Sequence, residues 1–165
     1  MVNLNAATAS KETAEVILQP LTAPSVDEVS RLLERPVQLL YPNGRGWLAS
    51  RLQDIVRGKA LGIVAWQAES AVGVAILTPK SADQMKLSTV FVAEQARNWG
   101  IGSALIHEAV LRADAGGVTE LWVTVAHHIA PQLTRLLHTA GFTETAFLCN
   151  RYGSGRHEIV YTRVW

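Results

Sequence analysis

The spacing of apolar and polar residues along the chain predicts a mixture of strands and helices. Short stretches with alternating or continuous apolar positions, rich in valine and isoleucine, are typical of strands. They predict strands at residues 15–21, 60–67, 71–78, 85–92, 121–125, 143–150 and 158–164. Longer stretches with apolar residues three and four apart predict helices at residues 25–35, 47–57, 102–115 and 131–140.

The ends of these helices are predicted from capping residues and helix breakers. Ser25 could cap the first helix, and Glu28 stands three residues later, at the spacing of a capping box. Pro36 is expected to close that helix, because proline lacks a backbone N–H and its ring clashes with the preceding turn. Gly58 and Gly141 are expected to stop the second and the last helix.

The order of the elements indicates the fold class. Hairpin-connected strands mixed with crossover helices imply an α/β fold with a mixed sheet and helices on both faces. With 165 residues, 48% of them apolar, the chain has the size and composition of one globular domain. Residues 1–13 are small and polar and are expected to be disordered. Residues 14–165 would then form the domain.

Composition and charge exclude several classes of protein. No apolar run reaches the roughly 18 residues that a membrane helix needs, and the first residues lack the pattern of a signal peptide. The single cysteine, Cys149, cannot form an internal disulfide and is expected to be a small buried side chain. We therefore expect a cytoplasmic protein with no membrane contact. The net charge of +1 argues against general nucleic-acid binding.

Residues 90–105 carry the most specific pattern: a strand, a short turn with two glycines, and the start of a helix. Gly100 and Gly102 allow a tight turn and a close approach to a ligand. The helix then presents unpaired N–H groups and a positive dipole end, which suit a phosphate, and Arg97 adds a charged planar group beside them. A Rossmann fingerprint would need a third glycine, and a P-loop would need Gly-Lys followed by Ser or Thr. Neither is present in this turn.

The spacing Arg-x-x-Gly-x-Gly after an apolar strand resembles the coenzyme-A-binding motif of the GNAT acetyltransferase superfamily. The segment Leu136-Leu-His-Thr-Ala-Gly141-Phe142 is similar to a later signature of the same superfamily, a helix followed by Gly-Phe. The resemblance covers residues 60–162 well and the first third of the chain poorly, and it is to single-domain bacterial members.

The resemblance implies a GNAT-like, mostly antiparallel mixed sheet in which strands 85–92 and 121–125 splay apart. It implies acetyl-CoA as the donor, with its pantetheine arm paired to strand 85–92 and its diphosphate on the glycine turn. The cofactor-binding residues that it implies are Val90, Phe91, Val92, Arg97, Asn98, Trp99, Gly100, Ile101, Gly102 and Ser103. The implied activity is N-acetyl transfer to an amine of a small molecule, peptide or protein, and a homodimer is left open.

The chain departs from that family at its usual proton-transfer positions. Leu137 stands where many members carry a tyrosine, Ala130 where many carry an asparagine, and strand 85–92 has no acid. Four side chains could replace them, although each also has an ordinary structural role open to it. Tyr152 lies in the last hairpin and Ser88 on the splayed strand. Neighbouring His127 and His128 follow strand 121–125 and titrate in the useful range.

Acceptor recognition in this fold usually comes from the first two helices and the last hairpin. That resemblance implies Tyr41, Trp47, Arg151 and Arg156 as substrate residues, with His157 beside them. No cysteine cluster or spaced acids indicate a metal site.

Three alternatives to this function stay open. The missing tyrosine and asparagine allow a catalytically weak acyl-CoA-binding regulator. The arginine-rich C-terminal stretch allows a toxin-like acetyltransferase acting on aminoacyl-tRNA, the one nucleic-acid partner considered. A purely structural or interaction domain is the third.

Overall fold

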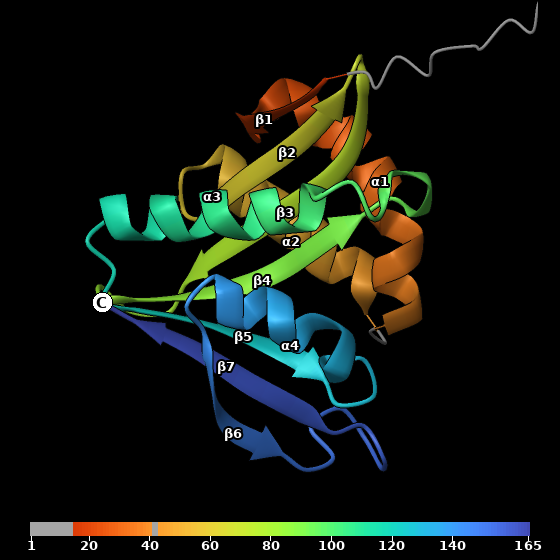
Figure 1. The fold of residues 1–165 in the computed structure, drawn as a ribbon. Helices are drawn as coiled ribbons and strands as arrows, with labels where there is room; N and C mark the ends of the chain where they lie inside the picture. Colours follow the sequence, from red (N-terminus) through yellow and green to blue (C-terminus); the bar gives the residue numbers. More distant parts are fainter. Residues whose placement is uncertain (1–14, 41–42) are drawn as a thin grey trace, which may run out of the picture.

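A computed structural model of the chain describes residues 15–40 and 43–165 (Figure 1). The expected disorder of residues 1–13 and the substrate role expected of Tyr41 lie outside this described part.

The described strands form one seven-stranded sheet with the order β1-β2-β3-β4-β5-β7-β6. The strands are β1 (Val16–Pro20), β2 (Leu61–Gln67), β3 (Ser70–Pro79), β4 (Gln84–Val92), β5 (Glu120–Ala126), β6 (Thr143–Leu148) and β7 (Glu158–Val164). Every neighbouring pair is antiparallel except β4 and β5, which are parallel. The predicted mixed, mostly antiparallel sheet is therefore confirmed.

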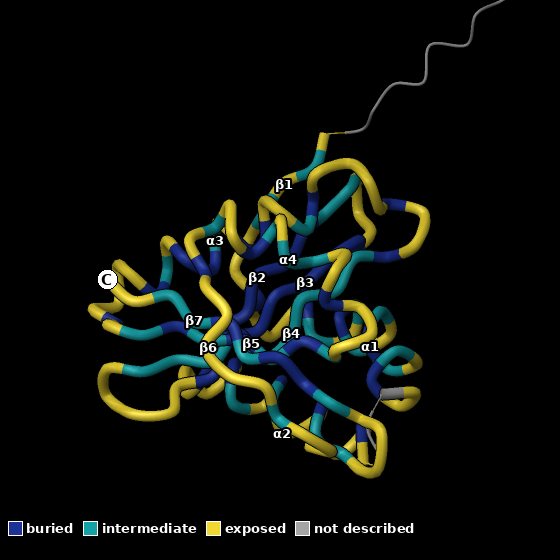
Figure 2. Tube along the Cα trace, turned by 60° about the horizontal axis from the view of Figure 1, so that its bottom comes forward, coloured by how far each residue is buried: buried dark blue, intermediate teal, exposed yellow. Residues whose placement is uncertain are grey.

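Helices cover both faces of this sheet, also as predicted (Figure 1). On one face, α1 (Val26–Leu40) and α2 (Gly44–Val56) pack on a core that includes Leu33, Leu52 and Val64. On the other, α3 (Ile101–Ala115) and α4 (Ala130–Thr139) pack on a core that includes Ile63 and Leu105. The adjacent residues Ile63 and Val64 point to opposite faces, as the two-residue period of a strand requires. Figure 2 shows the buried segments along the central strands.

Helix α1 does not end at Pro36, so that prediction was wrong. Proline removes one helical hydrogen bond, but the next residue, Val37, is only 4% exposed and packs in the α1–α2 core. At Gly44 the start of α2 lies so close to the Val37 carbonyl that a Cβ would overlap it. Tertiary packing of the last turn thus outweighs the local preference of the proline.

Two smaller expectations also need correction. Ser25 closes a short 3₁₀ turn (Ala23–Ser25) rather than pairing with Glu28: its hydroxyl donates to the Thr22 carbonyl at 2.8 Å and accepts from the Thr22 N–H at 2.9 Å. Cys149 is exposed, not buried. It follows β6, an edge strand whose residues are mostly exposed, so no core exists there to receive it.

The central parallel pair separates along its length, and this feature creates the site. Strands β4 and β5 pair only at Gln84–Glu120, Met85–Leu121 and Lys86–Trp122. Beyond Lys86 the two strands diverge, while β4 continues to pair with β3 as far as Val92. The predicted splay between strands 85–92 and 121–125 is therefore present in the structure.

A bulge in β4 lies just past the last β4–β5 pair. Ile76 of β3 faces Thr89 and the next residue, Leu77, faces Leu87, so Ser88 has no partner in the register. An extra residue in one strand bends it and redirects its side chains. The bulge therefore sits at the position where β4 turns away from β5.

Candidate functional site

The glycine turn has the backbone conformation that its sequence predicts. Asn98 and Gly100 both have positive φ, of 65° and 78°. Gly100 caps α3, which begins at Ile101, one residue earlier than expected. A Cβ added at Gly100 would meet no atom within 4 Å. No described side chain therefore covers Gly100 where α3 begins, and the first N–H groups of a helix are the ones that suit an anionic group.

Arg97 is fixed at the junction between β4 and this turn. Its Nε donates to the Val92 carbonyl at 3.1 Å, and its side chain is exposed. Val90 and Val92 partly pack against the α3 core, and Phe91 packs against the core on the opposite face. The side chains of these strand residues are thus used for packing, and the Val92 carbonyl already accepts from Arg97, so the backbone of Val90 and the Val92 N–H are the candidate ligand contacts.

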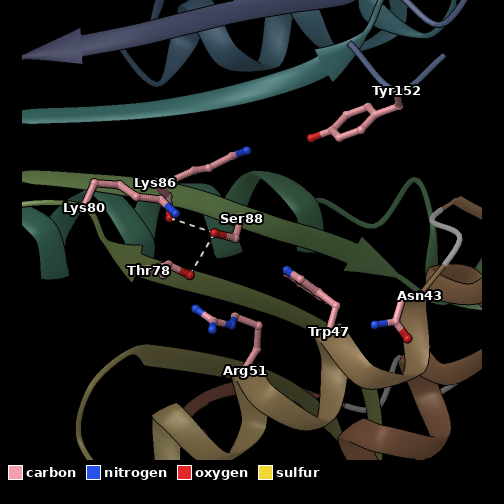
Figure 3. Close-up of a pocket in the computed structure, with 8 residues that line it drawn as sticks. All are labelled: Asn43, Trp47, Arg51, Thr78, Lys80, Lys86, Ser88 and Tyr152. Atoms are coloured by element: carbon pink, nitrogen blue, oxygen red, sulfur yellow. Dashed lines mark hydrogen bonds between the residues drawn. The ribbon is translucent and has the colours of Figure 1, made fainter.

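A cavity of about 410 Å³ lies at the other end of β4, on the face covered by α2 (Figure 3). The residues that line it come from α2, from β3 and β4 with the loop between them, and from the β6–β7 loop. The lining residues are Asn43, Trp47, Arg51, Thr78, Lys80, Lys86, Ser88 and Tyr152. In Figure 3 the Tyr152 hydroxyl points towards Lys86 across the gap above β4.

A pair of hydroxyl groups forms the floor of this cavity. Ser88 Oγ donates to Thr78 Oγ1 at 2.8 Å and lies 3.4 Å from the Lys86 carbonyl. Ser88 is the residue that the β4 bulge leaves out of register. The bulge therefore aims this hydroxyl at Thr78 of the neighbouring strand and places the pair beside the splay.

The cavity is positively charged. Three of its eight lining side chains are cationic, and none is an acid. Arg51 pairs with Asp54 of its own helix at 2.8 Å, while its buried Nε has no hydrogen-bond partner in the part of the chain that the structure describes. Lys86 lies over the Trp122 ring, with Nζ 4.7 Å from the ring centroid.

Two titratable groups beside the splay have shifted pKa values. Burial lowers the pKa of Lys86, and the charges of Lys80 and Arg151 act in the same direction while Glu158 opposes them. Burial also raises the pKa of the Glu158 carboxyl, against the opposing effects of Lys86, Arg156 and His128. In both groups the loss of hydration is the largest cause, because the charged form of each is disfavoured in a partly dry environment.

The structure brings some of the sequence-predicted residues together and leaves others apart. Ser88, Tyr152 and Trp47 line the same cavity. His128 is exposed and does not line it. Arg151 and Arg156 are exposed on the β6–β7 loop, where the Arg156 guanidinium carbon lies 5.9 Å from the Tyr152 ring centroid.

The other two predicted histidines, His127 and His157, belong to an aromatic group that does not line the cavity. His127 makes edge contacts with Phe147 and His157, at centroid distances of 5.4 and 6.4 Å. Leu137 and Ala130, at the family's usual tyrosine and asparagine positions, are each 3% exposed within the α4 core. Neither position contributes a polar group.

Sequence reasoning missed the cationic members of the cavity, although signals for two of them exist. Lys86 precedes Ser88 by two residues in an apolar strand, so both lie on one face. Arg51 follows Trp47 by four residues, which places both on one face of α2. Lys80, Thr78 and Glu158 gave no comparable signal, because only the folded sheet brings them near.

Within the described residues, no helix combines the length and apolar character needed to cross a bilayer. The same residues contain no group of three or more His, Cys, Asp or Glu side chains placed to hold a metal ion.

Comparison with known proteins gives a consistent picture. A family model described as the acetyltransferase (GNAT) family matches residues 26–142. No curated protein matches the chain in sequence. Several solved structures resemble it at full domain length.

The chain is similar to a GNAT family acetyltransferase from Elizabethkingia anophelis with acetyl-CoA bound: 19% identity, TM-score 0.72, covering 91% of this chain and 98% of the other. It is also similar to the ribosomal-protein-S18-alanine N-acetyltransferase from Escherichia coli, at 19% identity and TM-score 0.75, covering 91% and 94%. A third similar structure is the IAA acetyltransferase from Bacillus cereus, at 21% identity and TM-score 0.71, covering 92% and 100%. At these identities the likeness concerns the fold.

Proposed function

Because the chain belongs to the GNAT acetyltransferase family, we propose that it transfers an acetyl group from acetyl-CoA to an amine nitrogen. One observation carries the proposal: β4 leaves β5 after Lys86, with the glycine turn at one end of the separated strand and the cavity at the other. A long donor could lie along this strand while its acyl end reaches the cavity.

The proposed donor site combines the free edge of β4 with the start of α3. The β4 edge that faces β5 is unpaired beyond Lys86, so the backbone of Val90 and Val92 could pair with the amides of the pantetheine as an added strand would. The diphosphate would lie on the turn from Arg97 to Ser103. The acetyl-CoA bound to the Elizabethkingia anophelis structure supports this donor.

The proposed chemistry is direct transfer within a ternary complex. The amine nitrogen attacks the thioester carbonyl, a C–N bond forms and the C–S bond breaks. The amine's proton passes to water, and the coenzyme-A thiolate takes up a proton. Holding the two reactants in contact supplies most of the acceleration, and backbone N–H groups near the carbonyl would stabilise its developing charge.

Tyr152 and Ser88 are our candidates for assisting the proton transfers, because both line the cavity beside the splay. His128 remains a weaker candidate, since its exposed side chain would have to act through water. The cytoplasmic location also stays a prediction.

The experiment that tests this function is thiol release from acetyl-CoA across small amines, peptides and aminoacyl-tRNA. Turnover with an amine or peptide supports the proposal. Tight acetyl-CoA binding without any turnover would contradict it and favour a regulator, which the buried Leu137 in place of a tyrosine already makes a real second candidate. Turnover restricted to aminoacyl-tRNA would favour the toxin-like function.

A further inference from the structure

Three cations line the cavity, and among the described residues one of them forms an ion pair. Arg51 has Asp54 as an ion-pair partner. Within the described residues, neither Lys80 nor Lys86 forms an ion pair. These cations come from α2, from the β3–β4 loop and from β4, so three separate elements deliver positive charge to one place.

Lys86 distinguishes this group from an ordinary solvated surface, whereas Lys80 is exposed. Lys86 is partly buried, and Lys80 and Arg151 disfavour its charged form further, while Glu158 favours it. Within the described residues, the buried Nε of Arg51 has no hydrogen-bond partner, so only the outer part of this partly exposed guanidinium is accessible from the cavity. An anion in the cavity would pair with the Lys86 charge and could accept from the accessible guanidinium N–H groups of Arg51.

The phosphates of the donor do not account for these cations. Lys86 precedes Val92 by six residues of β4, and Arg97 and Gly100 lie farther along the chain. At about 3.3 Å per residue, six residues of strand span about 20 Å. The cationic group is thus separated from the diphosphate position by most of the pantetheine arm.

The size and lining of the cavity indicate a small molecule. About 410 Å³ lies within the usual range of small-ligand sites, roughly 300–1,000 Å³. Trp47 and Tyr152 contribute aromatic walls, on which a flat or apolar body can pack.

We propose that the acceptor is a small amine that also carries a carboxylate or phosphate group, held by Arg51, Lys80 and Lys86 with Trp47 and Tyr152 against its body. This inference rests on the proposed acetyl transfer, since it names the substrate class of that same site. The bound anion would direct the amine towards the place where β4 and β5 separate.

The test compares acceptors that differ only in the anion. One arm compares L-phenylalanine with 2-phenylethylamine, which lacks the carboxylate. A second arm compares phosphoethanolamine with ethanolamine and so distinguishes phosphate from carboxylate. An acidic peptide is included as a competing acceptor class. We expect kcat/KM to favour the anionic member of at least one pair by tenfold or more.

Charge-removing variants then locate the anion. Lys86→Met keeps the apolar stem over Trp122, and Lys80→Gln removes a second charge. Each should raise KM for the carboxylate- or phosphate-bearing acceptor about tenfold, with KM for acetyl-CoA unchanged and KM for the amine that lacks the anionic group unchanged or lower, because that amine is itself a cation. Lys59→Gln is the matched control, because Lys59 is exposed and does not line the cavity.

Binding of L-phenylalanine and phosphoethanolamine to the protein saturated with coenzyme A separates this inference from the proposed function. Binding that is lost in Lys86→Met, without turnover of any amine, keeps the anion site and overturns the acetyl transfer. Equal turnover of amines with and without the carboxylate or phosphate group, or preference for the peptide, keeps the transfer and overturns the anion site. Absence of both binding and turnover counts against both.

Discussion

The two ends of β4 carry two different kinds of candidate ligand site, one formed by backbone groups and the other by side chains. At its C-terminal end, the turn from Arg97 to Gly102 offers backbone to a ligand: two positive-φ residues and the first N–H groups of α3. Towards its N-terminal end, the cavity offers side chains from α2, β3, β4, the β3–β4 loop and the β6–β7 loop. The first region is contiguous in sequence, and the second is assembled only by folding.

This difference indicates which residues of the two candidate sites can be substituted without loss of the fold. A backbone site requires glycine or a special φ at fixed positions, so few sequences can build it. A side-chain site on the same scaffold can change its charge one residue at a time without disturbing the sheet. We therefore expect substitutions at the turn to remove the donor, and substitutions in the cavity to alter the choice of acceptor.

The largest expected effect is at Gly100. Gly100→Arg should weaken acetyl-CoA binding by 100-fold or more, because its side chain would fill the space in front of α3. The measurement is the rise in Tm at saturating acetyl-CoA, which reports binding to the native state. Gly58→Arg is the matched control: Gly58 also has positive φ, 71°, with no atom within 4 Å of an added Cβ. Loss of the Tm rise in both variants would mean that backbone strain, not the site, is responsible.

Gly102 should separate stability from donor binding. A Cβ at this helical position would lie 3.8 Å from Val92 Cγ2, an ordinary contact. Gly102→Ala should therefore raise the free energy of unfolding by about 0.5–1 kcal/mol through helix propensity. It should also weaken acetyl-CoA binding roughly tenfold, since the methyl group occupies space next to the expected diphosphate. Unchanged affinity measured by calorimetry would place the diphosphate elsewhere.

The candidate acid–base residues should have smaller effects than the glycines. Ser88→Ala, Tyr152→Phe, His127→Ala and His128→Ala should each lower kcat by less than roughly tenfold, about 1.4 kcal/mol of barrier. Losses this small would mean that positioning and a water relay carry the reaction, because a general acid or base typically contributes about 10²–10⁴-fold. If one variant loses about 10³-fold in kcat with its acetyl-CoA affinity intact, that residue is a true acid or base. Tyr152 is the first suspect, since its hydroxyl points into the cavity (Figure 3).

The same contrast explains what the sequence could predict. The glycine turn, the splay and the helix-covered mixed sheet follow from local spacing or from the family resemblance. The cavity does not, since Arg51, Lys80 and Lys86 are distributed over separate elements and become a cluster only through β3–β4 pairing and α2 packing. The misjudged end of α1 has the same origin: the burial of Val37 outweighs Pro36. Local signals predict contiguous structure, and long-range packing decides the rest.

The smallest expected effect tests the charge of Lys86 through pH. Burial, Lys80 and Arg151 lower its pKa below the ordinary value of 10.5, with Glu158 opposing. A lysine with a lowered pKa is charged below that pKa and loses its proton before an ordinary lysine as pH rises. Binding of an anionic ligand should therefore weaken as pH rises towards 10.5, by roughly threefold, because the neutral amine still donates a hydrogen bond. The probe is 3-phenylpropionate, whose carboxylate stays ionised throughout and which has no amine of its own. Its binding is measured on the coenzyme-A complex.

The lowered pKa also means that the folded state disfavours the charged lysine, so the free energy of unfolding should rise as pH passes through the folded pKa of Lys86 towards 10.5. Lys86→Met should remove both trends, and a pH dependence that persists in Lys86→Met would assign the titration to another group.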